Sequence, residues 1–209
     1  MHNAPRRTSS EISPQVLIRL QEYVKLLREW RLVTNLLSSE ALDDVWFRHI
    51  EDCLVLIRLA PEAKCWLDIG AGAGLPSVVV ACHLVDVQGA CVYSVDSDGR
   101  KCVFLREVAR RLELPLRVYN RRAESLSPAE IWPVDVLTAR AFATLPKILG
   151  IAKPFVTAGA VALLQRGKTA TSELDEIDNN CYSCESVPSM SGGGGTIFHI
   201  KRRKLASTI

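Results

Sequence analysis

Residues 65–76 decide the fold of this chain, and their sequence is CWLDIGAGAGLP. The mostly apolar residues 65–69 predict a short buried strand, and the glycines that follow predict a tight turn into a helix. Glycines at alternate positions, Gly70, Gly72 and Gly74, carry no side chain, so a ligand can approach the backbone amides of the turn closely. The segment therefore predicts the strand, turn and helix that open a nucleotide-binding α/β sheet.

Two kinds of nucleotide site use such a glycine turn. A nicotinamide or flavin site has the pattern G-x-G-x-x-G, which needs a third glycine where this chain has Leu75. An acid followed by three alternating glycines, here led by Asp68, is the pattern of methyltransferases that use S-adenosylmethionine. A second acid, Asp96, ends the strand-like run 90–96, where a carboxylate can accept hydrogen bonds from ribose hydroxyls. A solvated turn residue also fits Asp96, but together the two features favour the cofactor site.

Length and composition predict one domain. The chain has 209 residues, of which 48% are hydrophobic, enough for one α/β domain with a short extension. Its net charge of +3 is only mildly basic, but its basic residues gather in clusters. Such clusters are typical of a phosphate-binding face, although each one alone fits a solvated edge. The clusters are Arg6-Arg7, Arg100-Lys101, Arg110-Arg111, Arg121-Arg122 and 201–204.

The cysteines and apolar runs bear on metals, compartment and membranes. Seven cysteines, mostly inside apolar runs, are typical of core thiols in a reducing compartment. The single pair Cys181 and Cys184 does not supply the four ligands of a zinc site, so we predict no metal. The first 15 residues are polar, and no apolar run has the length needed to span a bilayer. We therefore expect a cytoplasmic protein without a membrane partner.

Three regions are predicted along the chain. We expect residues 1–12 to be a flexible N-terminus, 13–62 to form an N-terminal helical extension, and 63–209 to form the methyltransferase domain. In the extension, apolar residues at spacings of three and four predict a helix capped by Ser13 and a second helix over about 40–59.

Strands and helices alternate after the extension, which predicts a parallel sheet covered on both faces. The predicted strands are 65–69, 90–95, 115–119, 134–138 and 160–164, with helices over 76–84, 99–112 and 144–154. Two further strands, 181–187 and 196–201, flank the glycine run 192–195 and predict an antiparallel hairpin at the sheet edge. The expected fold class is α/β: a Rossmann-like seven-stranded S-adenosylmethionine-dependent methyltransferase sheet with an N-terminal helical extension.

The loops after successive parallel strands meet at one edge of such a sheet. The first loop is the glycine turn with Leu75, and the second carries Asp96. The third carries Ala123 and Glu124, and the fourth carries Arg140, whose side chain we expect to point into the site. The loop offers a backbone amide and the carboxylate of Glu124 at the place where an adenine amino group would bind. Glu124 could instead cap the turn that follows. Arg140 could likewise be the ion-pair partner of a helix end.

The loop after the fourth strand narrows the choice of methyl acceptor. Enzymes that methylate an exocyclic amine usually have Asn or Asp before Pro-Pro and an aromatic residue there, whereas 138–142 is TARAF. A cytosine C5 enzyme needs a nucleophilic cysteine, and none lies between Cys102 and Cys181. Guanine N7 already has a free lone pair, so the enzyme has only to align it with the methyl carbon and sulfur. The lack of an obvious catalytic base is consistent with this acceptor.

Several motifs along the chain occur together in one family. They are Trp30 with Asn35-Leu36, RHIEDC at 48–53, the turn at 67–76, Val95-Asp96-Ser97 with Arg100-Lys101 and Phe104-Leu105, Ala123-Glu124, and ARAFA at 139–143. On these motifs the chain resembles the glucose-inhibited division protein B family, the bacterial small-subunit (16S) ribosomal RNA guanine-N7 methyltransferases also called methyltransferase G. The resemblance covers about residues 20–200, and generic methyltransferases lack the motifs that precede the sheet.

The resemblance implies roles for individual residues. It implies S-adenosylmethionine contacts at Gly70, Leu75, Ala123, Glu124 and Arg140, with Asp96 as the ribose acid, and the glycine turn adds Gly72. His49 and Asp52 are three residues apart on one helix face and are candidates for substrate contact, although His49 equally fits a structural histidine. Arg166 is a third candidate, and it keeps the charge of the lysine that the family usually has there. The sequence identifies no catalytic residue, and whether a side chain assists the methyl transfer is left open.

We expect an enzyme that transfers a methyl group from S-adenosyl-L-methionine to the N7 of a guanine in 16S ribosomal RNA. The resemblance implies that the RNA is presented within the small ribosomal subunit, and we expect the protein to be a monomer. One alternative is a methyltransferase of a small molecule or protein, which would not need the basic surface. The other is a noncatalytic RNA-binding ribosome-assembly factor, which would bind RNA without the cofactor. The fold alone does not decide among these.

Overall fold

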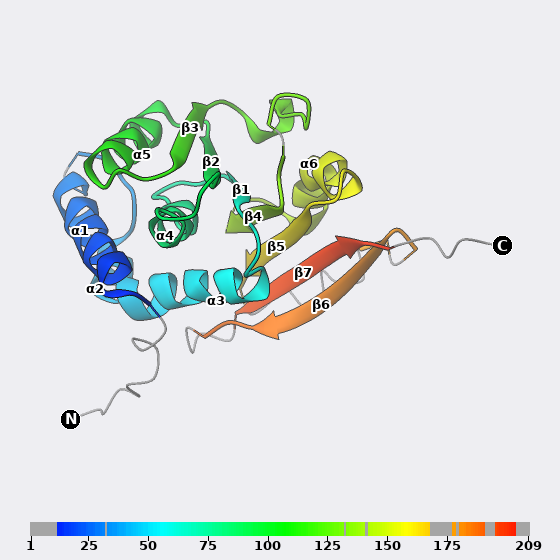
Figure 1. Ribbon diagram of the computed structural model, residues 1–209, viewed down its shortest axis with the longest axis horizontal. Coiled ribbons are helices and arrows are strands. Elements are labelled where there is room, and N and C mark those ends of the chain that lie inside the picture. Colours follow the sequence, from blue (N-terminus) through cyan, green and yellow to red (C-terminus); the bar gives the residue numbers. More distant parts are fainter. Residues whose placement is uncertain are drawn as a thin grey trace.

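The sheet of this protein has seven strands in the order β3-β2-β1-β4-β5-β7-β6 (Figure 1). The computed structural model describes residues 12–203 except 32, 132, 141, 168–176, 179 and 191–194. The strands are β1 (Cys65–Ile69), β2 (Cys91–Asp96), β3 (Leu116–Asn120), β4 (Val136–Arg140), β5 (Val161–Arg166), β6 (Tyr182–Pro188) and β7 (Thr196–Arg202). β1 to β5 run parallel, while β7 pairs antiparallel with both β5 and β6. The predicted α/β fold is confirmed, and each strand lies within two residues of its predicted bounds.

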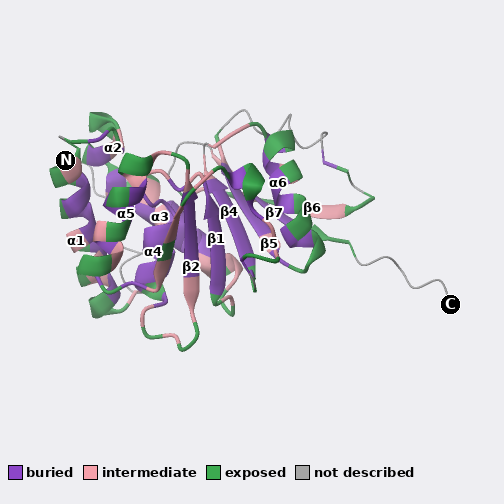
Figure 2. Cartoon of the chain, turned by 90° about the horizontal axis from the view of Figure 1, so that it is seen from above, coloured by how far each residue is buried: buried purple, intermediate pink, exposed green. Residues whose placement is uncertain are grey.

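Helices cover both faces of the sheet (Figure 1). One face carries α1 (Pro14–Trp30), α3 (Glu51–Leu59), α4 (Ser77–His83) and α5 (Gly99–Arg111), and the other carries α6 (Leu145–Thr157). Successive side chains of a strand point to opposite faces, so each face has its own hydrophobic cluster. Figure 2 shows the resulting burial of the central strands. Within the described part of the chain, every helix is too short or too polar to span a lipid bilayer.

The helical extension begins as predicted but is broken further on. The Ser13 hydroxyl accepts a hydrogen bond from the Val16 amide and caps α1. The single helix predicted over 40–59 is instead three segments: α2 (Ser39–Asp43), the π-helix η1 (Trp46–Ile50) and α3. Apolar periodicity continues across the breaks and therefore does not reveal them. The wide turn of η1 is informative, because π-helical turns occur frequently at functional sites.

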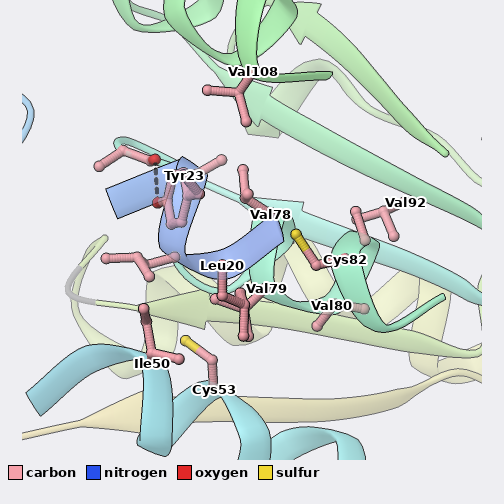
Figure 3. Packing of buried hydrophobic residues seen from close by; sticks show 14 of the residues in the cluster. Leu20, Tyr23, Ile50, Cys53, Val78, Val79, Val80, Cys82, Val92 and Val108 are labelled. Carbon is pink, nitrogen blue, oxygen red and sulfur yellow. Dashed lines mark hydrogen bonds between the residues drawn. The ribbon is translucent and has the colours of Figure 1, made fainter. Parts of the chain in front are cut away.

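The extension is packed into the glycine turn itself (Figure 3). Leu20 of α1 and Ile50 of η1 pack with Val79 of α4 in one hydrophobic cluster. Tyr23 is completely buried, and its hydroxyl donates a hydrogen bond of 2.7 Å to the carbonyl oxygen of Ala73, drawn as a dashed line in Figure 3. The boundary at residue 62 stays a prediction, but the two predicted regions share this cluster.

Candidate functional site

The glycine turn after β1 is held in a conformation that a larger residue would not adopt easily. Gly70 and Gly72 have positive φ angles of 71° and 56°, a region that residues with a Cβ atom rarely occupy. A Cβ atom on Gly70 would also lie 2.2 Å from a ring carbon of Phe142. The amides of Gly70 and Ala71 both donate to the carbonyl oxygen of Val95, at 2.9 and 3.0 Å. The turn is therefore fixed against β2.

Asp96 connects the end of β2 to this turn. One carboxylate oxygen accepts a hydrogen bond from the Gly72 amide and the other accepts one from the Asp98 amide, each at 2.8 Å. The side chain is only partly buried and lines the crevice above the turn. Each oxygen keeps a lone pair for a further donor, so the carboxylate is available to ribose hydroxyls.

Asp68, the other acid of the motif, lies beneath the turn. Its carboxylate accepts hydrogen bonds from the Ser77 amide at 3.2 Å and the Thr138 hydroxyl at 2.9 Å. Burial raises the pKa of Asp68 to about 7. Asp68 therefore ties the turn to α4 and β4 and does not face the crevice.

The crevice has a volume of about 330 Å³, within the range of small-molecule sites. It is lined by Gly70, Gly72, Val95, Asp96, Ser97, Lys101, Arg121, Arg122, Ala123, Glu124, Phe142 and Lys147. Five of the seven predicted cofactor residues are thereby brought together from three separate loops, namely Gly70, Gly72, Asp96, Ala123 and Glu124. Convergence of these loops at the carboxyl edge of the sheet follows from the parallel strand order.

Glu124 lies in the short 3-10 helix η2 (Ala123–Ser125) and forms an ion pair with Lys147 at 2.8 Å. The hydrogen bond from Lys147 lowers the pKa of Glu124, so the carboxylate is charged at neutral pH. Sequence reasoning missed both Lys147 and Phe142 as crevice residues. The available signal was their position just after the fourth strand, where loops of this sheet converge.

Leu75 and Arg140, the other two predicted cofactor residues, do not line the crevice. Leu75 is buried in the hydrophobic cluster on the α4 side of the sheet. Arg140 ends β4, but its guanidinium points to η1, where Nη2 donates to the Arg48 carbonyl oxygen at 3.2 Å and contacts Nδ1 of His49 at 2.5 Å. Arg140 lies two residues after Thr138, so both side chains point to the face that the extension covers. The expected orientation of Arg140 into the crevice therefore differs from the observed one.

His49 is a neutral partner of Arg140. Burial, followed by the positive charge of Arg140, lowers the pKa of His49 to about 4. At neutral pH Nδ1 therefore accepts a hydrogen bond from the guanidinium, and the ring proton is carried by Nε2.

The other substrate candidates hold neighbouring loops. Asp52 accepts hydrogen bonds from the Ser189 hydroxyl at 2.6 and 2.7 Å, which joins α3 to the segment after β6. Arg166 ends β5 and donates to the Ala143 carbonyl oxygen at 2.6 Å. His49 and Asp52, although three residues apart, thus contact different partners. We call His49, Asp52, Arg140, Gln165 and Arg166 the η1 cluster.

Gln165 is the member that sequence reasoning missed. It pairs in register with Arg140 on the neighbouring parallel strand, so both side chains lie on the same face of the sheet. Gln165 is only 7% exposed, and both atoms of its amide have no hydrogen-bond partner among the described residues. The same holds for Nη1 of Arg140 and Nε2 of His49. Buried polar atoms without partners are rare in folded proteins and indicate a site for water or a ligand. A polar residue at the end of an apolar strand was the signal available.

Metal coordination has no candidate group in the described part of the chain: no three His, Cys, Asp or Glu side chains there lie close enough together. The seven cysteines are free thiols, and four of them are buried.

A family model described as rRNA small subunit methyltransferase G, GidB, matches residues 17–200 of the chain. The chain belongs to this family. The ribosomal RNA small subunit methyltransferase G of Nitrobacter winogradskyi is 40% identical over 201 residues, which cover 92% of this chain and 71% of the relative. The protein of that name from Caulobacter vibrioides is 42% identical over 184 residues, which cover 88% of this chain and 83% of the relative. The resemblance to the methyltransferase G family is confirmed.

Solved structures with low sequence identity share the fold of this methyltransferase G family member. The 16S rRNA methylase RmtB aligns with a TM-score of 0.58 at 14% identity, covering 92% of this chain and 76% of that one. A SAM-dependent methyltransferase from Aquifex aeolicus aligns with a TM-score of 0.58 at 13% identity, covering 75% and 91%. A methyltransferase from Geobacter sulfurreducens reaches 0.56 at 14% identity, covering 92% and 90%. The predicted methyltransferase sheet is thereby confirmed.

Proposed function

We propose that this chain transfers a methyl group from S-adenosyl-L-methionine to the N7 of a guanine in 16S ribosomal RNA. The proposal is carried by the crevice over the glycine turn and Asp96, in a chain that belongs to the rRNA small subunit methyltransferase G family. We further propose that it works as a cytoplasmic monomer on RNA within the small ribosomal subunit.

The residues of the crevice fit the cofactor. The backbone at Gly72 is open, because a Cβ atom there would meet only the Gly70 carbonyl oxygen, at 3.8 Å. Asp96 offers charged acceptors for two ribose hydroxyls, and the backbone of Ala123 with the carboxylate of Glu124 offers a polar edge for adenine. When bound, S-adenosyl-L-methionine supplies an electrophilic methyl group. Gly70 also lines the crevice. Leu75 and Arg140 are the remaining cofactor contacts proposed from the family pattern.

We propose that the η1 cluster binds the guanine that accepts the methyl group. The Gln165 amide has both a donor and an acceptor unused, which suits the adjacent O6 and N1–H of guanine. His49 adds an Nε2–H donor, and its Nδ1 holds Nη2 of the Arg140 guanidinium. Asp52 and Arg166 hold the loops on either side. Guanine N7 needs no deprotonation, so these residues have only to orient the base and exclude water.

The test uses small ribosomal subunits from cells that lack this gene, incubated with the pure protein and labelled S-adenosyl-L-methionine. The RNA is digested and its nucleosides are identified by mass spectrometry. We expect new N7-methylguanosine with the wild type and with Arg28→Ala, an exposed change on α1. We expect its loss with Arg140→Ala.

Two other results would replace the proposal. Binding of the cofactor without methylation of any RNA nucleoside would favour a small-molecule or protein acceptor. Binding of the subunit without binding of the cofactor would favour an assembly factor. A cofactor titration of the same preparation distinguishes the two results, because the cofactor binds in the first and not in the second.

A further inference from the structure

The positive charge of this protein is concentrated in one segment. Residues 99–122 contain eight Lys and Arg residues against Glu107 and Glu113, which gives the segment a formal charge of +6. The whole chain carries only +3, so the rest of it is net negative. The eight residues are Arg100, Lys101, Arg106, Arg110, Arg111, Arg117, Arg121 and Arg122, and we call them the basic edge.

The fold places the basic edge at one end of the sheet. The segment forms α5, the edge strand β3 and the loop after it (Figure 1). Arg106 and Arg110 are exposed and four residues apart, so they lie on one face of α5, while Arg100 is exposed at the N-terminal end of the helix. They extend along about 15 Å of helix. Three clusters that are separate in the sequence thus lie on α5 and on the strand and loop that pack beside it.

The basic edge is continuous with the crevice. Lys101, Arg121 and Arg122 belong to it and also line the crevice. α5 begins at Gly99, just after the carboxyl end of β2 that carries Asp96. The helix therefore leads from the rim of the crevice along the outside of the sheet.

Acidic neighbours balance only part of this charge. Glu107 is shared by Arg110 and Arg111, at 3.0 and 2.6 Å. Glu130 pairs with Arg121 at 2.9 Å, and Asp98 lies 3.8 Å from Arg100. The remaining four, namely Lys101, Arg106, Arg117 and Arg122, form no ion pair with any described residue. The surface therefore keeps an excess of positive charge.

We propose that the basic edge binds the phosphate backbone of the RNA strand whose guanine enters the crevice. This inference rests on the proposed function. Arginine guanidinium groups match phosphate geometry, and phosphate contacts fix the position of a nucleic acid without reading its sequence. A row of them beside the crevice would hold the strand while the base is turned into the site.

The other basic clusters do not fit this role. Lys201, Arg202 and Arg203 lie at the end of β7, which is separated from β3 by four strands in the sheet order. Arg202 and Arg203 also donate to backbone carbonyl oxygens of Thr157 and Tyr182. The predicted cluster Arg6-Arg7 lies outside the described residues.

The test compares two variants that lose the same charge in different places. Arg106→Gln with Arg110→Gln neutralises two exposed residues of the basic edge that do not line the crevice, and Glu107 keeps Arg111 as its partner. Lys153→Gln with Lys201→Gln neutralises two exposed residues on α6 and β7. Binding to small ribosomal subunits is measured by filter retention across a salt series, and cofactor affinity is measured on each preparation.

We expect the basic-edge variant to bind subunits at least ~10-fold more weakly at ~0.1 M salt. Its plot of log affinity against log salt should lose about one unit of slope per lost phosphate contact. The control variant should bind like the wild type, and all three proteins should bind the cofactor equally.

Equal subunit binding by the two variants, with the wild type active in methylation, would overturn this inference and leave the proposed function intact. A wild type that binds the cofactor but neither binds nor methylates subunits would overturn the proposed function, and this inference with it.

Discussion

The crevice over the glycine turn and the η1 cluster lie at the same edge of the sheet but are built differently. The crevice is shaped by backbone: the amides of Gly70, Ala71 and Gly72 are all hydrogen-bonded to β2. The η1 cluster is shaped by side chains from four elements, namely η1, α3, β4 and β5, and atoms of His49, Arg140 and Gln165 remain buried without partners among the described residues.

This difference indicates that the two halves of the site are prepared to different degrees. A turn that is already bonded needs no rearrangement to hold a nucleotide, which lowers the cost of binding. The η1 cluster is complete only with a further group that satisfies its buried donors and acceptor. Substitutions in each half test whether damage to one half leaves the other intact.

The largest effect is expected from Gly70→Ala. The new methyl group would meet Phe142 at 2.2 Å, in a backbone region unfavourable to alanine. We expect cofactor affinity to fall ~100-fold or more, because the turn must move away from β2 to relieve the contact. Gly89→Ala is the matched control, since Gly89 has a φ of 79° but nothing within 4 Å of an added Cβ atom. It should cost about 1–2 kcal/mol of unfolding free energy without loss of affinity, and an equal loss of affinity in both variants would contradict the prediction.

The two acids of the motif should separate binding from stability. Asp96→Ala should weaken cofactor binding by ~10–100-fold, since it removes charged hydrogen bonds to the ribose. Asp68→Asn should act on the fold. Burial raises the pKa of Asp68 to about 7, so between about pH 4 and 7 the folded state binds a proton that the unfolded state has released.

The unfolding free energy contributed by Asp68 is therefore greatest at low pH and falls as pH rises through about 7. Urea unfolding of the wild type and of Asp68→Asn is measured at pH 5 and pH 8. The unfolding free energy of the wild type minus that of Asp68→Asn should fall as pH rises. A pH-independent difference would show that the Asp68 carboxyl group is ionised in the folded protein.

Gln165→Leu tests the other half alone. Leucine removes the unpartnered amide but keeps most of the side-chain volume, so cofactor affinity should not change. We expect the KM for small ribosomal subunits to rise ~10-fold, because the base loses its partner. Gln21→Leu, an exposed change on α1, serves as the control. A changed cofactor affinity in Gln165→Leu, with normal KM for the subunits, would move Gln165 to the cofactor side.

The smallest effect is expected from Tyr23→Phe, which removes only the bond from α1 to the Ala73 carbonyl oxygen. A buried acceptor that loses its donor costs about 1–3 kcal/mol of unfolding free energy. We expect a lower Tm and a cofactor affinity only a few-fold weaker. Tyr119→Phe, on the partly buried edge strand β3, should leave both unchanged. No change in Tm for Tyr23→Phe would show that the extension does not hold the turn.

Local features of the site were predictable from sequence. The strand ends, the turn at Gly70 and the position of Asp96 follow from apolar runs and glycine spacing, which act over a few neighbouring residues. The break at η1 was not predictable, because the apolar period of the extension continues across it. Lys147 and Gln165 were missed because their roles depend on neighbouring loops and strands.

By itself, the sequence determined the α/β order, the glycine turn and its two acids, because backbone conformation depends on which residues lack a Cβ atom. Only the tertiary structure decided that Asp68 supports the turn while Asp96 faces the crevice, and that Arg140 meets His49. It also gathered three separate basic clusters on one edge. These outcomes depend on which strands are neighbours and which face each side chain occupies, and residues far apart in the chain meet only when the sheet is assembled.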